Sequence, residues 1–270
     1  MIVLVELAKM ARRPRTWVSI GLLCALPALV AVFLAVTQLG PGPGEDPAFL
    51  SAVLNNGALF PAAALAIVLP IFLPVAVAVV GGDAIAGEAS GGTLRYLLLR
   101  PVGRTWLLVA KLVSLVVYVV VAVLAVASTS FLVGVSLFPS EPAAVTTVSG
   151  VTLTSTELST RMLGAMGYVA VSMLGVGAIA LFLSTLTDSS LAAALGALAA
   201  FVTSQVLVTL DAAGDVRPYL PTRYWLAWID FFRNPILWRD IERGAAVQLV
   251  YVAVFLALAW ANFKSKDVTS

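Results

Sequence analysis

Long runs without a charged residue dominate the hydrophobic pattern of this chain and predict its helices. Six such runs lack Asp, Glu, Lys and Arg, and they cover residues 16–44, 47–82, 112–140, 162–187, 189–210 and 244–263. A membrane-spanning helix needs about 20 predominantly apolar residues, and a charged side chain at the bilayer centre costs at least ~2.5 kcal/mol. The pattern therefore predicts an all-α integral membrane protein with six transmembrane helices.

Two stretches of the apolar pattern carry further local signals. The run 47–82 contains Pro61, Pro70 and Pro74, so we expect a bent or broken helix there, serving either gating or ordinary packing. Residues 142–156 also lack charges, but they are few, β-branched and rich in hydroxyl groups. This second stretch is therefore predicted to be a loop.

Residues 1–15 precede the first apolar run and predict a separate amphipathic helix. Over residues 2–13, one face carries Glu6, Lys9 and Arg13 and another carries Leu4, Leu7 and Ala11. This arrangement is typical of a helix lying in the membrane interface, and a frayed extension of the first span explains it equally well. The following run is far longer than the apolar part of a signal peptide, which argues against cleavage.

The distribution of Lys and Arg predicts the orientation of the chain. An even number of spans places both termini on one side, and that side would carry ten basic residues: Lys9, Arg12, Arg13, Arg15, Arg95, Arg100, Arg104, Lys111, Lys264 and Lys266. The opposite side would carry six: Arg161, Arg217, Arg223, Arg233, Arg239 and Arg243. The excess predicts cytoplasmic termini in the cell membrane, with one six-helix domain over 16–263 and a cytoplasmic tail over 264–270.

Composition excludes several classes of function. Of the 270 residues, 61% are hydrophobic and 11% are charged, so a soluble or disordered chain is excluded. The formal charge of +2 is too small for a nucleic-acid-binding surface. Without histidine, and with Cys24 as the single cysteine, the chain can form no internal disulfide and no zinc site of the usual ligands.

Only neutral polar residues fall within the predicted spans, which disfavours transport coupled to protons or ions. Candidates for lining a pathway are Ser128, Thr129, Ser130, Ser172, Thr203, Ser204 and Gln205. The simpler interpretation is that the hydroxyl groups bond to carbonyls of their own helices.

The predicted cytoplasmic loop 81–105 contains two Gly-Gly pairs. These pairs bracket a short segment that Asp83 could cap, and a second short helix could begin at Thr93 and end before Pro101. Its leucines, Leu94 and Leu97–Leu99, would either dock a soluble partner or rest on the bilayer interface. The two carboxylates of the loop, Asp83 and Glu88, could instead hold Mg²⁺ in a membrane-embedded enzyme, although no third acidic residue is near in sequence.

The loop also carries a specific resemblance. Glu88, then Gly92-Thr93-Leu94, then Arg100-Pro101-Val102-Gly103-Arg104 and Lys111, resemble the cytoplasmic signature of ATP-binding-cassette type-2 permeases. Residues 183–190 are similar to the tight turn of that family between spans four and five, and residues 262–268 are similar to its usual ending. The likeness covers nearly the whole chain.

The resemblance implies the fold and the partners of a type-2 exporter permease. Two permease subunits, identical or paralogous, would work with two ATPase subunits, which would hold the ATP and Mg²⁺. The implied ATPase-coupling residues are Asp83, Glu88, Gly92, Thr93, Leu94, Arg100, Arg104 and Lys111, although a solvated loop obeying the positive-inside rule would need some of the same charges. This chain lacks the Gly-Lys-Ser/Thr of a phosphate-binding loop, so we expect no cofactor and no ATPase activity in it.

Residues 211–243, here called the outer segment, are rich in aromatic residues. Trp225, Trp228 and Phe232 share one face at helical spacing, which predicts an interfacial or partly re-entrant helix. It would either anchor the chain among headgroups or cover the exit of a pathway.

The expected function is therefore export of an amphipathic or hydrophobic solute, such as a drug, a lipid or a peptide, with energy from a separate ATPase. The alternative is a non-transporting structural subunit, or a channel-like component, of a larger membrane assembly.

Overall fold

The computed structural model describes residues 2–37, 53–54, 56–92, 103–139, 145–146 and 152–265. Their elements are, in chain order, α1 (Ile2–Arg12), α2 (Pro14–Thr37), the 3₁₀ turn η1 (Gly57–Leu59), α4 (Phe60–Val68), α5 (Phe72–Ser90), α7 (Arg104–Leu137), β1 (Val145–Thr146), β2 (Thr152–Leu153), α8 (Ser155–Leu186), α9 (Ser190–Thr209), the 3₁₀ helices η2 (Asp211–Tyr219) and η3 (Trp225–Phe232), and α10 (Trp238–Ser265).

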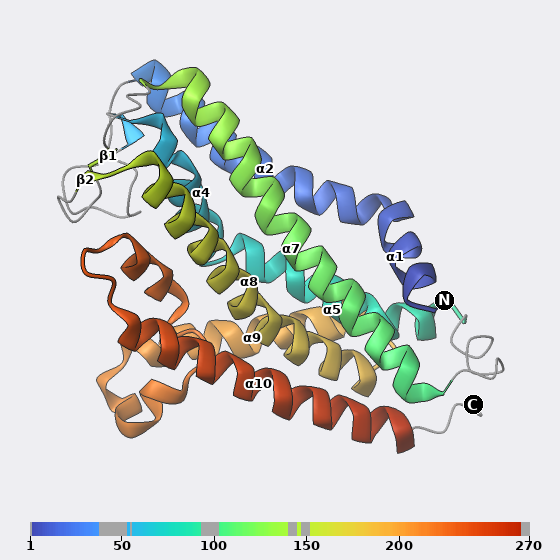
Figure 1. The fold of residues 1–270 in the computed structure, drawn as a ribbon. Coiled ribbons are helices and arrows are strands. Elements are labelled where there is room, and N and C mark those ends of the chain that lie inside the picture. Colours follow the sequence, from blue (N-terminus) through green and yellow to red (C-terminus); the bar gives the residue numbers. More distant parts are fainter. Residues whose placement is uncertain are drawn as a thin grey trace.

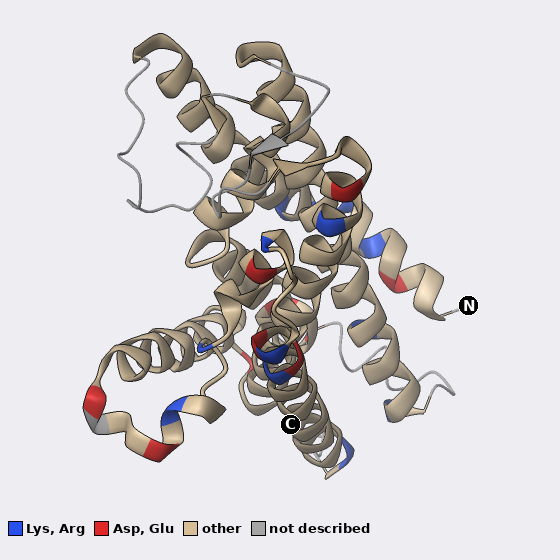
Figure 2. Cartoon of the chain, turned by 60° about the vertical axis from the view of Figure 1, so that its left-hand side comes forward, with Lys and Arg blue, Asp and Glu red and all other residues tan. Residues whose placement is uncertain are grey.

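Six of the described helices are long and apolar enough to cross a membrane: α2, α5, α7, α8, α9 and α10. This confirms the prediction of an all-α membrane protein with six candidate spans. Figure 2 shows long helical stretches without any charged residue. The observed helices extend beyond the charge-free runs, because α7 begins at Arg104 and α8 begins at Ser155.

Local sequence signals explain several helix ends. Thr154 and Glu157 form a reciprocal capping box at the start of α8, and the Ser189 hydroxyl accepts a hydrogen bond from Ala192 N–H at the start of α9. Only residues 187–189 separate these two helices, which is the tight turn expected from the sequence. In the predicted loop 142–156, β1 and β2 pair antiparallel, with Val145 opposite Leu153.

The predicted break in the second apolar run is confirmed, and the prolines explain its position. Pro61 lies in the first turn of α4, Pro70 lies in the turn between α4 and α5, and Pro74 lies in the first turn of α5. Backbone N–H groups in a first helical turn have no partner within the helix, so proline costs little there. The chain therefore forms two short helices instead of one.

The predicted start of the cytoplasmic loop is wrong. Helix α5 continues through Gly81 and Gly82 to Ser90, so Asp83 does not cap a helix, and residues 81–90 of the expected loop 81–105 are helical. A Cβ on Gly82 would lie 2.8 Å from Ala194 N, which shows how closely α5 approaches α9. The helix that was predicted from Thr93 falls outside the described residues.

The extension of α5 also means that candidate spans carry ionisable side chains beyond the charge-free runs, in which only neutral polar residues were expected. Asp83 and Glu88 belong to α5, and Lys111 belongs to α7, and both helices are candidate spans. All three side chains are buried. Asp83 and Glu88 each have a basic partner, which lowers the cost of burying their charges.

The helices form two groups (Figure 1). The first helix group contains α1, α2, α4 and α7, and the second contains α5, α8, α9 and α10; the most extensive contacts of each helix lie within its own group. Since α4 and α5 belong to different groups, the chain passes from one group to the other at the proline-containing break. The start of α1 and the end of α10 lie at the same end of the bundle.

Candidate functional site

Seven ionisable residues gather where α1 meets α5 and α7, and we call them the ion-pair cluster: Glu6, Lys9, Arg13, Arg15, Asp83, Glu88 and Lys111. In its first half, Lys111 Nζ lies 2.7 Å from Glu6 Oε2 and also contacts Glu88 Oε1. Lys9 Nζ completes this half, at 2.8 Å from Glu6 Oε1 and 3.2 Å from Glu88 Oε1. Two ammonium groups and two carboxylates therefore alternate.

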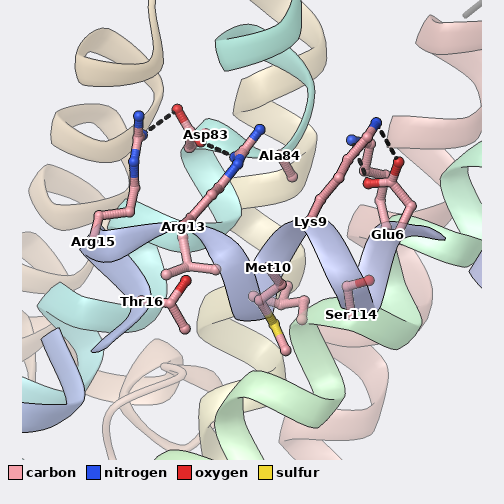
Figure 3. Close-up of a pocket in the computed structure, with 12 residues that line it drawn as sticks. Glu6, Lys9, Met10, Arg13, Arg15, Thr16, Asp83, Ala84 and Ser114 are labelled. Atoms are coloured by element: carbon pink, nitrogen blue, oxygen red, sulfur yellow. Dashed lines mark hydrogen bonds and ion pairs between the residues drawn. The ribbon is translucent and has the colours of Figure 1, made fainter. Parts of the chain in front are cut away.

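The second half of the cluster centres on Asp83. Arg13 Nη1 lies 2.5 Å from Asp83 Oδ2, and Arg15 Nη1 lies 2.6 Å from Asp83 Oδ1. Figure 3 shows the two arginine side chains approaching this carboxylate from different directions. One carboxylate thus holds two guanidinium groups, one from Arg13 at the junction between α1 and α2 and one from the first turn of α2.

Burial differs within the cluster. The side chains of Glu6, Glu88 and Lys111 are only 3–5% exposed, whereas those of Lys9, Arg13 and Arg15 are 36%, 38% and 55% exposed. The cluster therefore has a buried part and a solvent-facing margin, the basic rim, which consists of Lys9, Arg13 and Arg15.

The charges on α1 reinforce one another. Burial opposes ionisation of Glu6, but the charge of Lys111 and its hydrogen bond, together with those of Lys9, outweigh it and hold the pKa of Glu6 below 4.5. Burial likewise opposes the charge on Lys9, yet the hydrogen bond to Glu6 and the charge of Glu88 raise the pKa of Lys9 above 10.5. Both residues are charged at neutral pH.

Short sequence features position these side chains. Glu6, Lys9 and Arg13 follow one another at intervals of three and four residues, so α1 presents them on one face. In α5, Gly87 leaves room for the Asp83 carboxylate, because a Cβ on Gly87 would collide with it. Leu4, on the other face of α1, is 70% exposed. The charged face of α1 therefore packs inward, and an apolar side chain points away.

The cluster joins the two helix groups. Its four cations and Glu6 come from the first group, and Asp83 and Glu88 come from the second. Attraction across this boundary closes the bundle at the end that carries both chain termini. Each carboxylate of α5 already has basic partners, so these two groups favour ion pairs over the Mg²⁺ ligation considered above.

The hydroxyl group of Ser184 links the charged turn of α5 to α8. Ser184 Oγ donates to Gly82 O at 2.7 Å and accepts from Ile85 N at 3.0 Å and Ala86 N at 2.8 Å. One residue further along α8, Thr185 accepts a hydrogen bond from Asn262 Nδ2 of α10 at 2.9 Å. Two neighbouring residues of α8 therefore hold α5 and α10.

The remaining predicted coupling residues are dispersed around this end. Gly92 follows α5 with φ +66°, a left-handed conformation that favours glycine. Arg104 begins α7 and donates to Lys264 O at 2.8 Å, so it caps the C-terminal end of α10. Thr93, Leu94 and Arg100 lie outside the described residues.

The predicted pathway residues occupy separate surroundings on three helices. Ser128 and Thr129 bond to carbonyls of their own helix, as the simpler interpretation expected. Ser172 and Ser130 are buried in α8 and α7. Thr203 is exposed on α9, and Gln205 is partly exposed there. Ser204 is buried and lies 2.7 Å from the Thr222 hydroxyl, which ties the outer segment to α9.

Of the two alternatives for the aromatic residues, anchoring among headgroups does not hold for these three side chains. Trp225, Trp228 and Phe232 are 3%, 0% and 2% exposed, because η3 turns them into the protein core. Phe201 of α9 packs against Trp225 with ring centroids 5.8 Å apart. Their burial stabilises the outer segment and removes them from the headgroup region.

Sequence reasoning missed Arg15, Gly87 and Ser184 as site residues, and it described Glu6, Lys9 and Arg13 only as a face of α1. The available signal was the complementarity between the basic residues at the end of α1 and the acidic residues Asp83 and Glu88. It was overlooked because the acidic pair was placed in a solvated loop.

The sequence profile of a family described as "Protein of unknown function (DUF2705)" matches residues 45–269. No curated protein sequence matches the chain.

Proposed function

The chain belongs to the DUF2705 family, and we propose that it is the membrane-spanning permease subunit of an exporter whose energy comes from a separate ATPase. In this proposal two copies of the chain, or the chain and a paralogue, adopt the type-2 ATP-binding-cassette arrangement in the cell membrane. Two ATPase subunits bind at the cytoplasmic end and hold ATP and Mg²⁺. The solute is amphipathic or hydrophobic.

The observation that carries the proposal is the ion-pair cluster between the two helix groups. A permease must open and close its helices in response to a partner, and this requires a boundary with two discrete arrangements. Ion pairs suit such a boundary, because water can solvate each charge when the groups separate. Helix α1 supplies Glu6 and Lys9, and Arg13 follows its last residue, so a force on α1 acts directly on this boundary.

The positions of the coupling candidates refine their roles. Asp83, Glu88 and Lys111 are buried and bind residues of this chain, so they act as positioning residues between α1, α5 and α7. Contact with the ATPase is proposed for the segment that follows Gly92 and for the exposed face of α1. The excess of basic residues at this end supports a cytoplasmic location for both termini.

The proposal is tested on the full-length chain purified together with its ATPase partner in lipid nanodiscs. We expect no ATP hydrolysis by the chain alone and steady hydrolysis by the complex. In intact cells the complex should export a fluorescent amphipathic dye, and Glu88→Gln should reduce that export at least about tenfold, since Lys111 then loses a charged partner.

The matched control is Glu242→Gln, which removes the same charge from an exposed position of α10. It should leave both activities unchanged. Robust ATP hydrolysis by the isolated chain, or dye export that is the same with and without the chain, would contradict the proposal.

A further inference from the structure

A small cavity lies beside the ion-pair cluster, between α1, α5 and α7, with a volume of about 50 Å³ (Figure 3). Its lining includes four basic residues, Lys9, Arg13, Arg15 and Lys111, and two acidic residues, Glu6 and Asp83. Glu88 also contacts Lys9 and Lys111, so four positive charges face three negative charges and leave an excess of one positive charge around the opening. The cavity is therefore suited to an anionic group.

Exposed tryptophans indicate the depth of this cavity in the membrane. Trp17, Trp106 and Trp260 are 58%, 65% and 42% exposed, and they lie on α2, α7 and α10 near the end that carries both termini. The Trp260 indole N–H donates to Thr105 Oγ1 at 3.0 Å, so α10 and α7 meet at this end. Exposed tryptophan is enriched at the headgroup level, so the cavity opens where lipid headgroups lie.

The arginines of the basic rim retain binding capacity. Arg13 and Arg15 each contact Asp83 through Nη1, and a guanidinium group carries five N–H donors. Both side chains are more than a third exposed, so the remaining donors are accessible. Guanidinium groups bind phosphate oxygens in pairs of parallel hydrogen bonds, which favours phosphate over other anions.

We propose that the basic rim binds the phosphate of an anionic phospholipid headgroup. A cavity of about 50 Å³ admits a phosphate-sized group but no acyl chain. The acyl chains lie instead along the neighbouring surface of α2, where Val18 and Leu22 are 59% and 66% exposed. This adjoining apolar surface favours a lipid over free phosphate.

The lipid phosphate and Asp83 compete for the same two guanidinium groups. Binding of the lipid weakens the attachment of Arg13 and Arg15 to α5, and removal of the Asp83 charge strengthens binding of the lipid. A merely structural role for the two arginines has no such consequence, because loss of Asp83 would then loosen the site.

Native mass spectrometry of the full-length chain in detergent tests this competition. Phosphatidylglycerol and phosphatidylcholine with identical acyl chains are added in equal amounts. We expect at least about tenfold preferential retention of phosphatidylglycerol, which Arg13→Gln/Arg15→Gln abolishes. Asp83→Asn should increase retention of phosphatidylglycerol. The charge-matched control, Arg239→Gln/Arg243→Gln at exposed positions of α10, should retain the wild-type preference.

The triple variant Arg13→Gln/Arg15→Gln/Asp83→Asn leaves no buried, unpaired carboxylate and must also lose the preference. Equal retention of both lipids by the wild type, an unchanged preference in the triple variant, or reduced retention in Asp83→Asn would overturn the proposal. Displacement of the lipid by millimolar inorganic phosphate would identify free phosphate as the ligand and would also overturn it. The assay needs neither the ATPase nor transport, so its outcome is independent of the proposed function.

Discussion

The two ends of the helix bundle are held together by different forces. At the end that carries both termini, buried carboxylates and ammonium groups connect α1, α5 and α7. At the opposite end, the outer segment packs through aromatic side chains, with Trp228 fully buried and Phe232 beside it at a centroid distance of 6.1 Å. The first end depends on charge, which water and protons can modify, and the second depends on close packing.

Hydrogen bonds to backbone carbonyls supplement the aromatic packing at the opposite end. The Tyr168 hydroxyl donates to Tyr224 O at 2.7 Å, and Gln248 Nε2 donates to Pro221 O at 2.5 Å. Arg161 of α8 donates to Arg233 O at 2.8 Å and so binds the backbone of the outer segment instead of a carboxylate. The outer segment is therefore held by aromatic packing and by hydrogen bonds to its backbone carbonyls.

Trp228→Ala should have the largest effect on this comparison. Removing a fully buried indole creates a cavity, and the expected loss of unfolding free energy is about 3 to 5 kcal/mol. Leu226→Ala is the control, because Leu226 is 51% exposed in the same helix and should cost little. Thermal unfolding in detergent measures both variants. Equal melting temperatures for the two would contradict the assignment of the aromatic core as the main support of this end.

Lys111→Met should have the next largest effect, at the charged end. Glu6 and Glu88 would both lose Lys111 and keep Lys9 as a basic partner, and the expected loss is about 3 kcal/mol. The double variant Lys111→Met/Glu88→Gln should recover part of this loss, since it removes one of the uncompensated carboxylates. Denaturant unfolding followed in parallel for the two variants makes the measurement. A double variant less stable than the single one would show that charge balance does not hold this end.

Lowering the pH should have the smallest of the three effects, and it should change the stability of the two ends in opposite directions. The pKa of Glu6 is lowered, so its contribution is fully present above pH 4.5 and is lost as the pH falls through the folded-state pKa. At the other end, burial raises the pKa of Asp230 above 3.8 although Arg233 opposes it, so the outer segment gains stability as the pH falls through this raised folded-state pKa towards 3.8.

Spin labels at the exposed positions Leu4 and Leu226 report on the two ends. As the pH falls from about 7 through the folded-state pKa of Glu6, the label on α1 should become more mobile, and the label on η3 should not. Glu6→Gln should abolish the change at Leu4. Increased mobility at Leu226 alone would reverse the comparison.

The features that could be predicted from the sequence are those set by residues that are close together along the chain. Charge-free runs identified all six candidate spans, because desolvation of a lone charge is costly over any helix. The prolines identified the break between α4 and α5. The capacity of Ser128 and Thr129 to bond within α7 was also anticipated from residue type.

What could not be predicted depends on partners that are distant in sequence. Asp83 and Glu88 remain in a helix because cations from α1 and α7 pair with them, and a charge count assigns such residues to a loop. Helical spacing placed Trp225, Trp228 and Phe232 on one face but could not indicate whether that face meets lipid or protein. The roles of the candidate site in coupling and transport remain predictions.

The length of α7 sets a geometric condition on the whole chain. Its 34 residues extend about 51 Å at 1.5 Å per residue, whereas the hydrocarbon layer of a bilayer is about 30 Å thick. Inclining the helix by about 40°, the upper limit commonly observed, still leaves a vertical height of about 39 Å. About 9 Å of α7 must therefore project beyond the hydrocarbon, so a thicker bilayer would fit this helix with less inclination.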